Sequence, residues 1–117
     1  MTLGQTQRAF TRLVGLLIAQ AYKMGYEVTL GDAYRDPRVF GMAGVKKGYG
    51  NRNSNHKRRL AIDLNLFKDG EYLDASEDHR PLGEWWENLG EKEGVPTAWG
   101  GRFNDGNHYS CEYNGQK

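Results

Sequence analysis

The chain has 117 residues, of which 26% are charged and 38% hydrophobic, and its formal net charge is only +1. A chain of this length folds as one domain that removes about two thirds of its unfolded surface from water, so it needs no disulfide framework. Its single cysteine, Cys111, cannot form an internal disulfide and is predicted to be a small, partly buried thiol beside a strand.

The N-terminal segment is predicted to be an amphipathic helix over residues 5–24. Its apolar residues follow the i, i+3, i+4, i+7 spacing of a helix face: Phe10, Leu13, Val14, Leu17, Ile18 and Ala21. Thr2 and Gln5 can form a capping box at its start. Arg8 and Arg12 before "LVGLLIA" imitate a secretory signal, but the helical spacing favours a core helix. We therefore expect synthesis in the cytoplasm without a signal peptide, and no stable insertion into a membrane.

A basic segment follows the first predicted strand. The strand is predicted in "YEVTLGDAYR", residues 26–35, and a long irregular loop rich in glycine and asparagine is predicted over residues 36–55. Loops of that length usually have a function. The segregated positive charge indicates a surface that meets a polyanion, although an ordinary solvated loop explains it equally well. Between Asp36 and Asp63 the chain has no acid and seven basic residues: Arg38, Lys46, Lys47, Arg52, Lys57, Arg58 and Arg59.

The segment "RLAIDLNLF" is predicted to be a strand, because its leucines and isoleucine alternate with other residues. This alternation places Asp63 on the face opposite to Leu60, Ile62, Leu64 and Leu66. "KDGEYL" continues through an Asp-Gly turn into a second strand, which predicts a hairpin.

A second helix is predicted from its start and stop signals, with Pro81 near its start and Gly94 after its end. One face would carry Leu82, Trp85, Trp86 and Leu89. His79, in the acidic turn "SEDHRP", has no partner motif and is expected to be exposed and without a role. "VPTAWGGRF" is predicted to be a loop, and "HYSCEY" a short final strand.

Four residues suggest a metal site. His56 and Asp63 are seven residues apart, and two helical turns would separate them by roughly 10 Å, so they could share a metal only across a bend or between strands. Alone, this pair favours an ordinary structural role. The C-terminal "WGGRFNDGNHYS" adds His108, with Asp105 three residues before it. Two His and one Asp leave a fourth position open on zinc, as in a catalytic site, and Asp105 remains for a general base.

The motifs "S-x-H-x(6)-D" and "W-G-G…D-x-x-H" resemble the zinc peptidases that include D-Ala-D-Ala carboxypeptidases and dipeptidases. They are most similar to phage endolysins that cleave the L-Ala–D-Glu bond of peptidoglycan, and the resemblance covers about residues 26–109. It implies the α+β fold shared with the hedgehog signalling domain and DD-peptidases, a small antiparallel sheet backed by helices. It further implies one catalytic domain over residues 1–117 without a separate cell-wall-binding domain, a monomer that acts on stem peptides of the bacterial cell wall.

The resemblance also assigns roles to the four residues of the metal site. His56, Asp63 and His108 would be the ligands of Zn²⁺, and Asp105 the catalytic acid/base. One departure lies between the first two ligands, where the family usually has a glycine three residues after the first histidine and this chain has Arg59. A residue other than glycine resists positive φ, so the conformation of this turn is an open question at the level of sequence.

Three further residues receive roles through the resemblance. Arg35 matches an arginine that would stabilise the oxyanion or hold a substrate carboxylate, although a salt bridge with Asp32 or Asp36 is a serious competitor. Ser54 matches a serine that would orient a ligand or the substrate backbone. Trp99, of the Trp-Gly-Gly motif, is assigned to substrate binding.

Other functions remain open at this level. A small metal nuclease would explain the basic residues, but it predicts a higher net charge and leaves Trp-Gly-Gly and Asp105 unexplained, so we expect no nucleic-acid partner. A non-catalytic hedgehog-like zinc domain would use its surface for recognition, and Asp105 argues against it. D-Ala-D-Ala carboxypeptidase or dipeptidase activity is the alternative to L-Ala–D-Glu endopeptidase activity.

Overall fold

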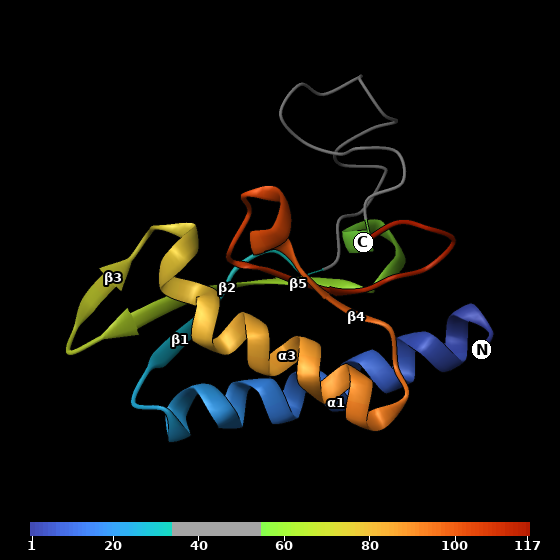
Figure 1. Cartoon of the computed structure of the whole chain (residues 1–117), viewed down its shortest axis with the longest axis horizontal. Coiled ribbons are helices and arrows are strands. Elements are labelled where there is room, and N and C mark those ends of the chain that lie inside the picture. Colours follow the sequence, from blue (N-terminus) through green and yellow to red (C-terminus); the bar gives the residue numbers. More distant parts are fainter. Residues whose placement is uncertain (34–54) are drawn as a thin grey trace.

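The computed structural model describes residues 1–33 and 55–117 and has the predicted α+β architecture, with helices packed against a five-stranded antiparallel sheet (Figure 1). The long loop predicted over residues 36–55 falls almost entirely outside the described residues. The strands are β1 (Glu27–Leu30), β2 (Ala61–Lys68), β3 (Glu71–Leu73), β4 (Thr97–Trp99) and β5 (His108–Cys111).

The first helix, α1 (Leu3–Lys23), confirms the N-terminal prediction and begins two residues earlier than expected. Its capping box is complete, because Gln5 N–H donates to Thr2 Oγ1 at 3.1 Å and Thr2 N–H donates to Gln5 Oε1 at 2.8 Å. The predicted apolar face is turned inward, and Leu13, Leu17 and Ala21 are fully buried.

The central strand, β2, pairs with β1 along one edge and with β5 and β3 along the other. It forms the predicted hairpin with β3, and the turn residues Asp69 and Gly70 have φ of 52° and 80°. Two successive positive φ values match the right-handed twist of the flanking strands, which explains the Asp-Gly sequence.

The second helix, α3 (Arg80–Glu93), confirms the prediction with Pro81 in its first turn and ends at Gly94, whose φ is 70°. Trp86 is fully buried, and its indole N–H donates to the carbonyls of Ala98 and Ser110 at 3.0 and 3.1 Å. This side chain therefore joins α3 to both C-terminal strands.

The prediction that "VPTAWGGRF" is a loop is wrong. Thr97–Trp99 form β4 at the edge of the sheet, and Gly100–Phe103 form the short 3-10 helix η3. Three residues beside two glycines carry little local strand signal, and β4 is a strand because it pairs with β5, Trp99 opposite Tyr109. The final strand is shorter than predicted but lies where "HYSCEY" placed it.

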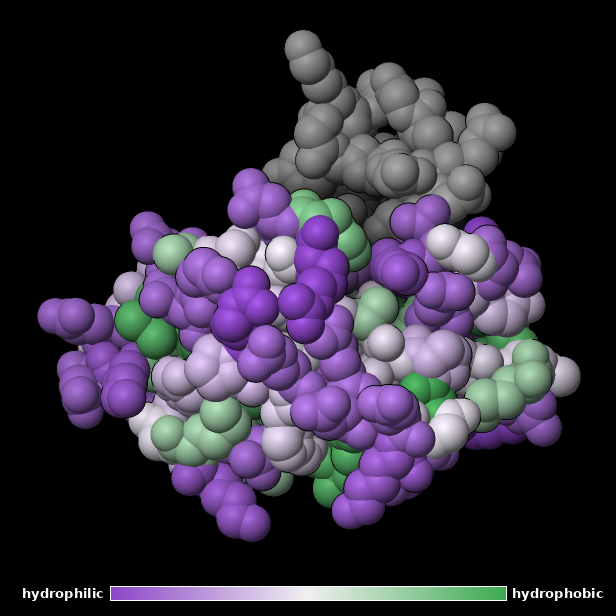
Figure 2. All heavy atoms as spheres, in the orientation of Figure 1, coloured by the Kyte–Doolittle hydropathy of each residue, from purple (hydrophilic) through white to green (hydrophobic). Residues whose placement is uncertain are grey.

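A single core forms between the helices and the inner face of the sheet. Leu60, Ile62, Leu64 and Leu66 all lie in it, as their alternation predicted, and Cys111 is fully buried, more than the partial burial expected. Hydrophilic residues cover most of the face seen in Figure 2, and hydrophobic residues appear there only as small separate patches. Within the described ranges, no helix is long and apolar enough to cross a membrane.

Candidate metal centre and active site

The outer face of the sheet brings two of the predicted metal ligands together. Asp63 in β2 and His108 in β5 are direct register partners of the antiparallel pair. Since the neighbours of Asp63 along β2 point into the core, the Asp63 carboxylate points to the opposite face, where His108 meets it. The alternation in the sequence predicted to which face of the sheet Asp63 points. The strand register shows that His108 is its neighbour on that face.

The third predicted ligand, His56, reaches the same place across the bend that the sequence required. It lies in the short 3-10 helix η1 (Asn55–Arg58), which turns into β2 through Arg59, with Leu60 N–H donating to the Asn55 carbonyl at 2.8 Å. Arg59 has φ of 58°, the left-handed conformation that a glycine adopts readily. The departure from glycine is therefore accommodated in the turn, at a cost of about 1 kcal/mol.

The three side chains are spaced as ligands of one metal ion. His56 Nε2 and His108 Nδ1 lie 3.2 and 3.5 Å from Asp63 Oδ1, and one ligand atom from each residue falls within 4.8 Å of the others. Ligands about 2.1 Å from a tetrahedral ion are about 3.4 Å apart, so both measured separations fit zinc. Asp63 Oδ1 is buried and has no hydrogen-bond partner among the described residues, so a cation would satisfy it.

The electrostatics also favour a ligand set. Burial alone would raise the pKa of Asp63, but the close imidazoles of His108 and His56 lower it to about 2, so the carboxylate is ionised at neutral pH. His56 Nδ1 lies 2.9 Å from the Ala33 carbonyl oxygen. If Nδ1 carries the proton and donates to this carbonyl, Nε2 presents its lone pair toward Asp63, as metal-binding histidines commonly do.

Asp105 lies beside this group and is not part of it. Its Oδ2 is 3.9 Å from His108 Nδ1, and its side chain is 52% exposed, whereas those of His56 and His108 are almost completely buried. The predicted base is thus open to solvent and to a substrate, and the predicted ligands are held in the protein.

A polar pocket of about 250 Å³ opens next to Asp105 and was not predicted. Its walls come from the segment that follows β3 and from the loop before β5, and they include Ser76, His79, Asn104, Asp105 and Asn107. The half-exposed ring of Phe103 makes an edge contact with the His108 ring, with 5.6 Å between the ring centres. The candidate site therefore has polar groups and one aromatic ring beside the predicted ligands.

The expectation that His79 is exposed is wrong. Only 3% of it is accessible, and its Nδ1 lies 2.7 Å from the hydroxyl of Tyr109, which is fully buried. Burial lowers the pKa of His79 to about 4, and it raises that of Tyr109. The residues next to His79 in the sequence do not predict this contact, because Tyr109 is 30 residues away in the chain.

The predicted substrate-binding residues have different outcomes. Arg35 and Ser54 lie outside the described residues. Trp99 is only 1% exposed, and its indole N–H donates to the Gly106 carbonyl at 2.7 Å. The assignment of Trp99 to substrate contact is therefore corrected, since a ring enclosed by the protein has no free surface for a ligand.

Comparisons with known proteins support a peptidase family and the fold. The family described as D-alanyl-D-alanine carboxypeptidase matches residues 47–111, more than half of the chain, and this range contains all four site residues. No curated protein matches the sequence. Among solved structures, the chain is similar to the L-Ala D-Glu endopeptidase ChiX of Serratia marcescens, with a TM-score of 0.65, 14% identity, and coverage of 93% of this chain and 85% of that chain. At this identity, the likeness supports the fold alone.

Proposed function

The chain belongs to the D-alanyl-D-alanine carboxypeptidase family, and on this premise we propose that it is a zinc-dependent peptidase that hydrolyses the stem peptides of peptidoglycan. The observation that carries the proposal is a buried His-Asp-His group with a solvent-exposed carboxylate beside it. Two histidines and one aspartate leave a coordination position open on zinc, as catalytic zinc sites do.

The ion would be held by His56, Asp63 and His108. Zinc at this place would lower the pKa of a water molecule to about 7 and polarise the scissile carbonyl. The ionised Asp63 supplies the negative charge that two neutral imidazoles lack, and the contact of His56 with the Ala33 carbonyl orients the first imidazole.

Asp105 would carry out the proton transfer. As a carboxylate outside the ligand set, it can accept a proton from the attacking water on Oδ2 and return that proton to the leaving amine. Arg35 would stabilise the charge that develops on the carbonyl oxygen or hold a substrate carboxylate, and Ser54 would orient a ligand or the substrate backbone, as the family resemblance implies.

We propose the L-Ala–D-Glu bond as the target, in an endolysin-like enzyme that acts on the bacterial cell wall as a monomer. The motif resemblance favours this bond, and the fold is similar to that of an L-Ala D-Glu endopeptidase. D-Ala-D-Ala carboxypeptidase or dipeptidase activity is the second candidate, because the matching family carries that description. The exposed Asp105 counts against a domain in which zinc is only structural.

Hydrolysis of defined muropeptides, with products identified by mass, tests the proposal. The zinc-loaded protein should release L-Ala from the D-Glu of the stem, and release of terminal D-Ala would select the second candidate. Asp105→Ala should keep the fold and the metal but lose at least a hundredfold in kcat, because the base acts in the transition state. No cleavage of any stem peptide by the parent protein would refute the proposal.

A further inference from the structure

The residue that follows Asp105 is held at both of its backbone polar groups. Trp99 donates its indole N–H to the Gly106 carbonyl at 2.7 Å, and Gly106 N–H donates to Ser76 Oγ at 3.0 Å. This N–H belongs to the peptide bond that joins Asp105 to Gly106. A Cβ at position 106 would collide with the backbone of Ser76, so the loop before β5 packs directly on the short 3-10 helix η2 (Ser76–His79).

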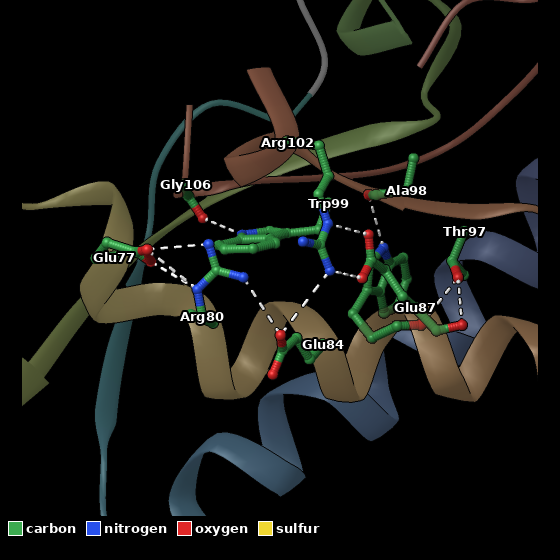
Figure 3. A network of polar contacts seen from close by, with 10 residues as sticks. Glu77, Arg80, Glu84, Glu87, Thr97, Ala98, Trp99, Arg102 and Gly106 are labelled. Atoms are coloured by element: carbon green, nitrogen blue, oxygen red, sulfur yellow. Dashed lines mark hydrogen bonds and ion pairs between the residues drawn. The ribbon is translucent and has the colours of Figure 1, made fainter. Parts of the chain in front are cut away.

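The indole of Trp99 is itself fixed on its surroundings. The guanidinium groups of Arg80 and Arg102 each lie 5.3 Å from its ring centre (Figure 3). The backbones of Gly83 in α3 and Gly101 in η3 approach the ring so closely that a Cβ on either would overlap it. Trp99 is therefore enclosed between α3 and η3, and its indole N–H points to the Gly106 carbonyl.

Acidic residues along η2 and α3 orient the two arginines (Figure 3). Arg80 makes paired contacts with Glu77 at 2.7 and 2.9 Å, and Arg102 makes paired contacts with Glu87 at 2.7 and 3.0 Å. Glu84 lies between them, 3.3 Å from Arg80 and 4.0 Å from Arg102. Such exposed pairs contribute little stability, but paired geometry fixes the plane of each guanidinium against the indole.

The Asp105 side chain, in contrast, has little support of its own. Among the described residues its carboxylate has one neighbour at ion-pair distance, His108 Nδ1 at 3.9 Å, and half of the side chain is exposed. Its position therefore follows from its backbone. Asp105 N–H donates to the Gly100 carbonyl at 2.8 Å, the Asp105 carbonyl accepts from His108 N–H at 3.0 Å, and Gly106 is held on the other side. A general base must lie within hydrogen-bond distance of the proton that it accepts, so a small shift of this backbone should lower kcat.

We propose that Trp99 and Ser76 are positioning residues, which set the place of the Asp105 carboxylate beside the metal ligands by holding the carbonyl and the amide of Gly106. This inference rests on the proposed function, since it gives Asp105 the role of base. It replaces the predicted contact of Trp99 with substrate by an action through the loop, and it adds Ser76, which no motif had indicated.

The test is Trp99→Phe, which keeps an aromatic ring between the arginines but removes the N–H. We expect kcat to fall about 10- to 100-fold, with KM changed only a few-fold and about one equivalent of zinc retained. Ser76→Ala, a smaller change that leaves the indole in place, should lower kcat in the same direction. Trp85→Phe is the matched control, because Trp85 is a half-buried tryptophan in α3 whose indole makes no hydrogen bond among the described residues.

Two further measurements separate positioning from simple destabilisation. In an Asp105→Ala background, Trp99→Phe should cause almost no additional loss of kcat, because it acts through the carboxylate that is already gone. In crystal structures of the parent and Trp99→Phe, Asp105 Oδ2 should move relative to His108 Nδ1 by about 1 Å. Equal losses of kcat in both backgrounds, or an unmoved carboxylate, would overturn the inference. The crystallographic result decides it even if the parent cleaves no stem peptide, which would refute the proposed function alone.

Discussion

Acid should destabilise the fold through His79, a residue with no part in the proposed chemistry. Burial lowers the pKa of His79 from 6.5 to about 4, against a smaller opposite effect of the neighbouring Asp78 carboxylate. The unfolded chain therefore binds a proton at a higher pH than the folded one. The stability that neutral His79 contributes is complete above pH 6.5 and is lost as the pH falls from 6.5 to about 4.

The size of this effect follows from the one extra proton that the unfolded chain binds, relative to the folded chain, over that pH interval. At about 1.4 kcal/mol per pH unit, the parent should lose about 3 kcal/mol in the free energy of unfolding between pH 7 and pH 4 because of His79. Asp63, whose pKa is lowered from 3.8 to about 2, acts in a separate window, since its contribution is present above 3.8 and lost toward pH 2. The two effects can therefore be resolved along the pH axis.

The matched variant is His79→Asn, whose amide can still bond the Tyr109 hydroxyl but does not titrate. Urea unfolding of both proteins, followed by tryptophan fluorescence in the same chelator-containing buffers, gives the free energy of unfolding at each pH. The chelator removes the pH dependence of metal binding from both curves. We expect the parent curve to fall more steeply than the variant curve between pH 6.5 and 4, by about 3 kcal/mol in total. Parallel curves would show that His79 is not a buried neutral histidine.

Two other predictions concern the metal and the basic segment. Protein purified without added zinc should contain about one equivalent, most of which His56→Ala should lose; stoichiometric zinc in a protein lacking both His56 and His108 would contradict the ligand set. Reversing Lys46, Lys47 and Arg52 to Glu, positions known only from the sequence, should weaken cleavage of whole cell walls, most at low salt, and leave turnover of a short soluble muropeptide nearly unchanged. Equal losses on both substrates without salt dependence would contradict electrostatic attraction.

Local patterns predicted the parts of the fold that depend on neighbouring residues. The spacing of Phe10, Leu13 and Leu17 with the Thr2 cap predicted α1, because both signals act within a few turns of one helix. Alternation predicted β2 and the side of the sheet to which Asp63 points. The grouping of His56, Asp63 and His108 as candidate ligands could be predicted for a different reason, because coordination chemistry restricts the residue types and the two motifs lie in distant segments that the fold brings together.

The features that sequence missed are produced by contacts between distant segments. β4 is a strand because Trp99 and Tyr109 lie opposite each other in the register, and neither position contains that information alone. His79 is buried against Tyr109, which lies 30 residues later in the chain, although the turn around His79 is acidic and polar. Trp99 was assigned to a substrate through the resemblance of its Trp-Gly-Gly motif, whereas in the fold Gly83 of α3 and Gly101 pack against its ring and the side chain is buried.

The metal ligands and the proposed base are held by different kinds of contact. Asp63 and His108 are register partners in the sheet, where a slip of one residue would turn a ligand into the core, so their geometry is as secure as the strand pairing itself. Asp105 lies on a loop that is held by backbone hydrogen bonds to Gly100 and His108 and by two side-chain hydrogen bonds to Gly106. The two side-chain bonds end at Gly106 and not at a ligand, so a substitution of Trp99 or Ser76 should lower turnover while the zinc content stays intact. Such a result would not indicate that the metal site was misassigned.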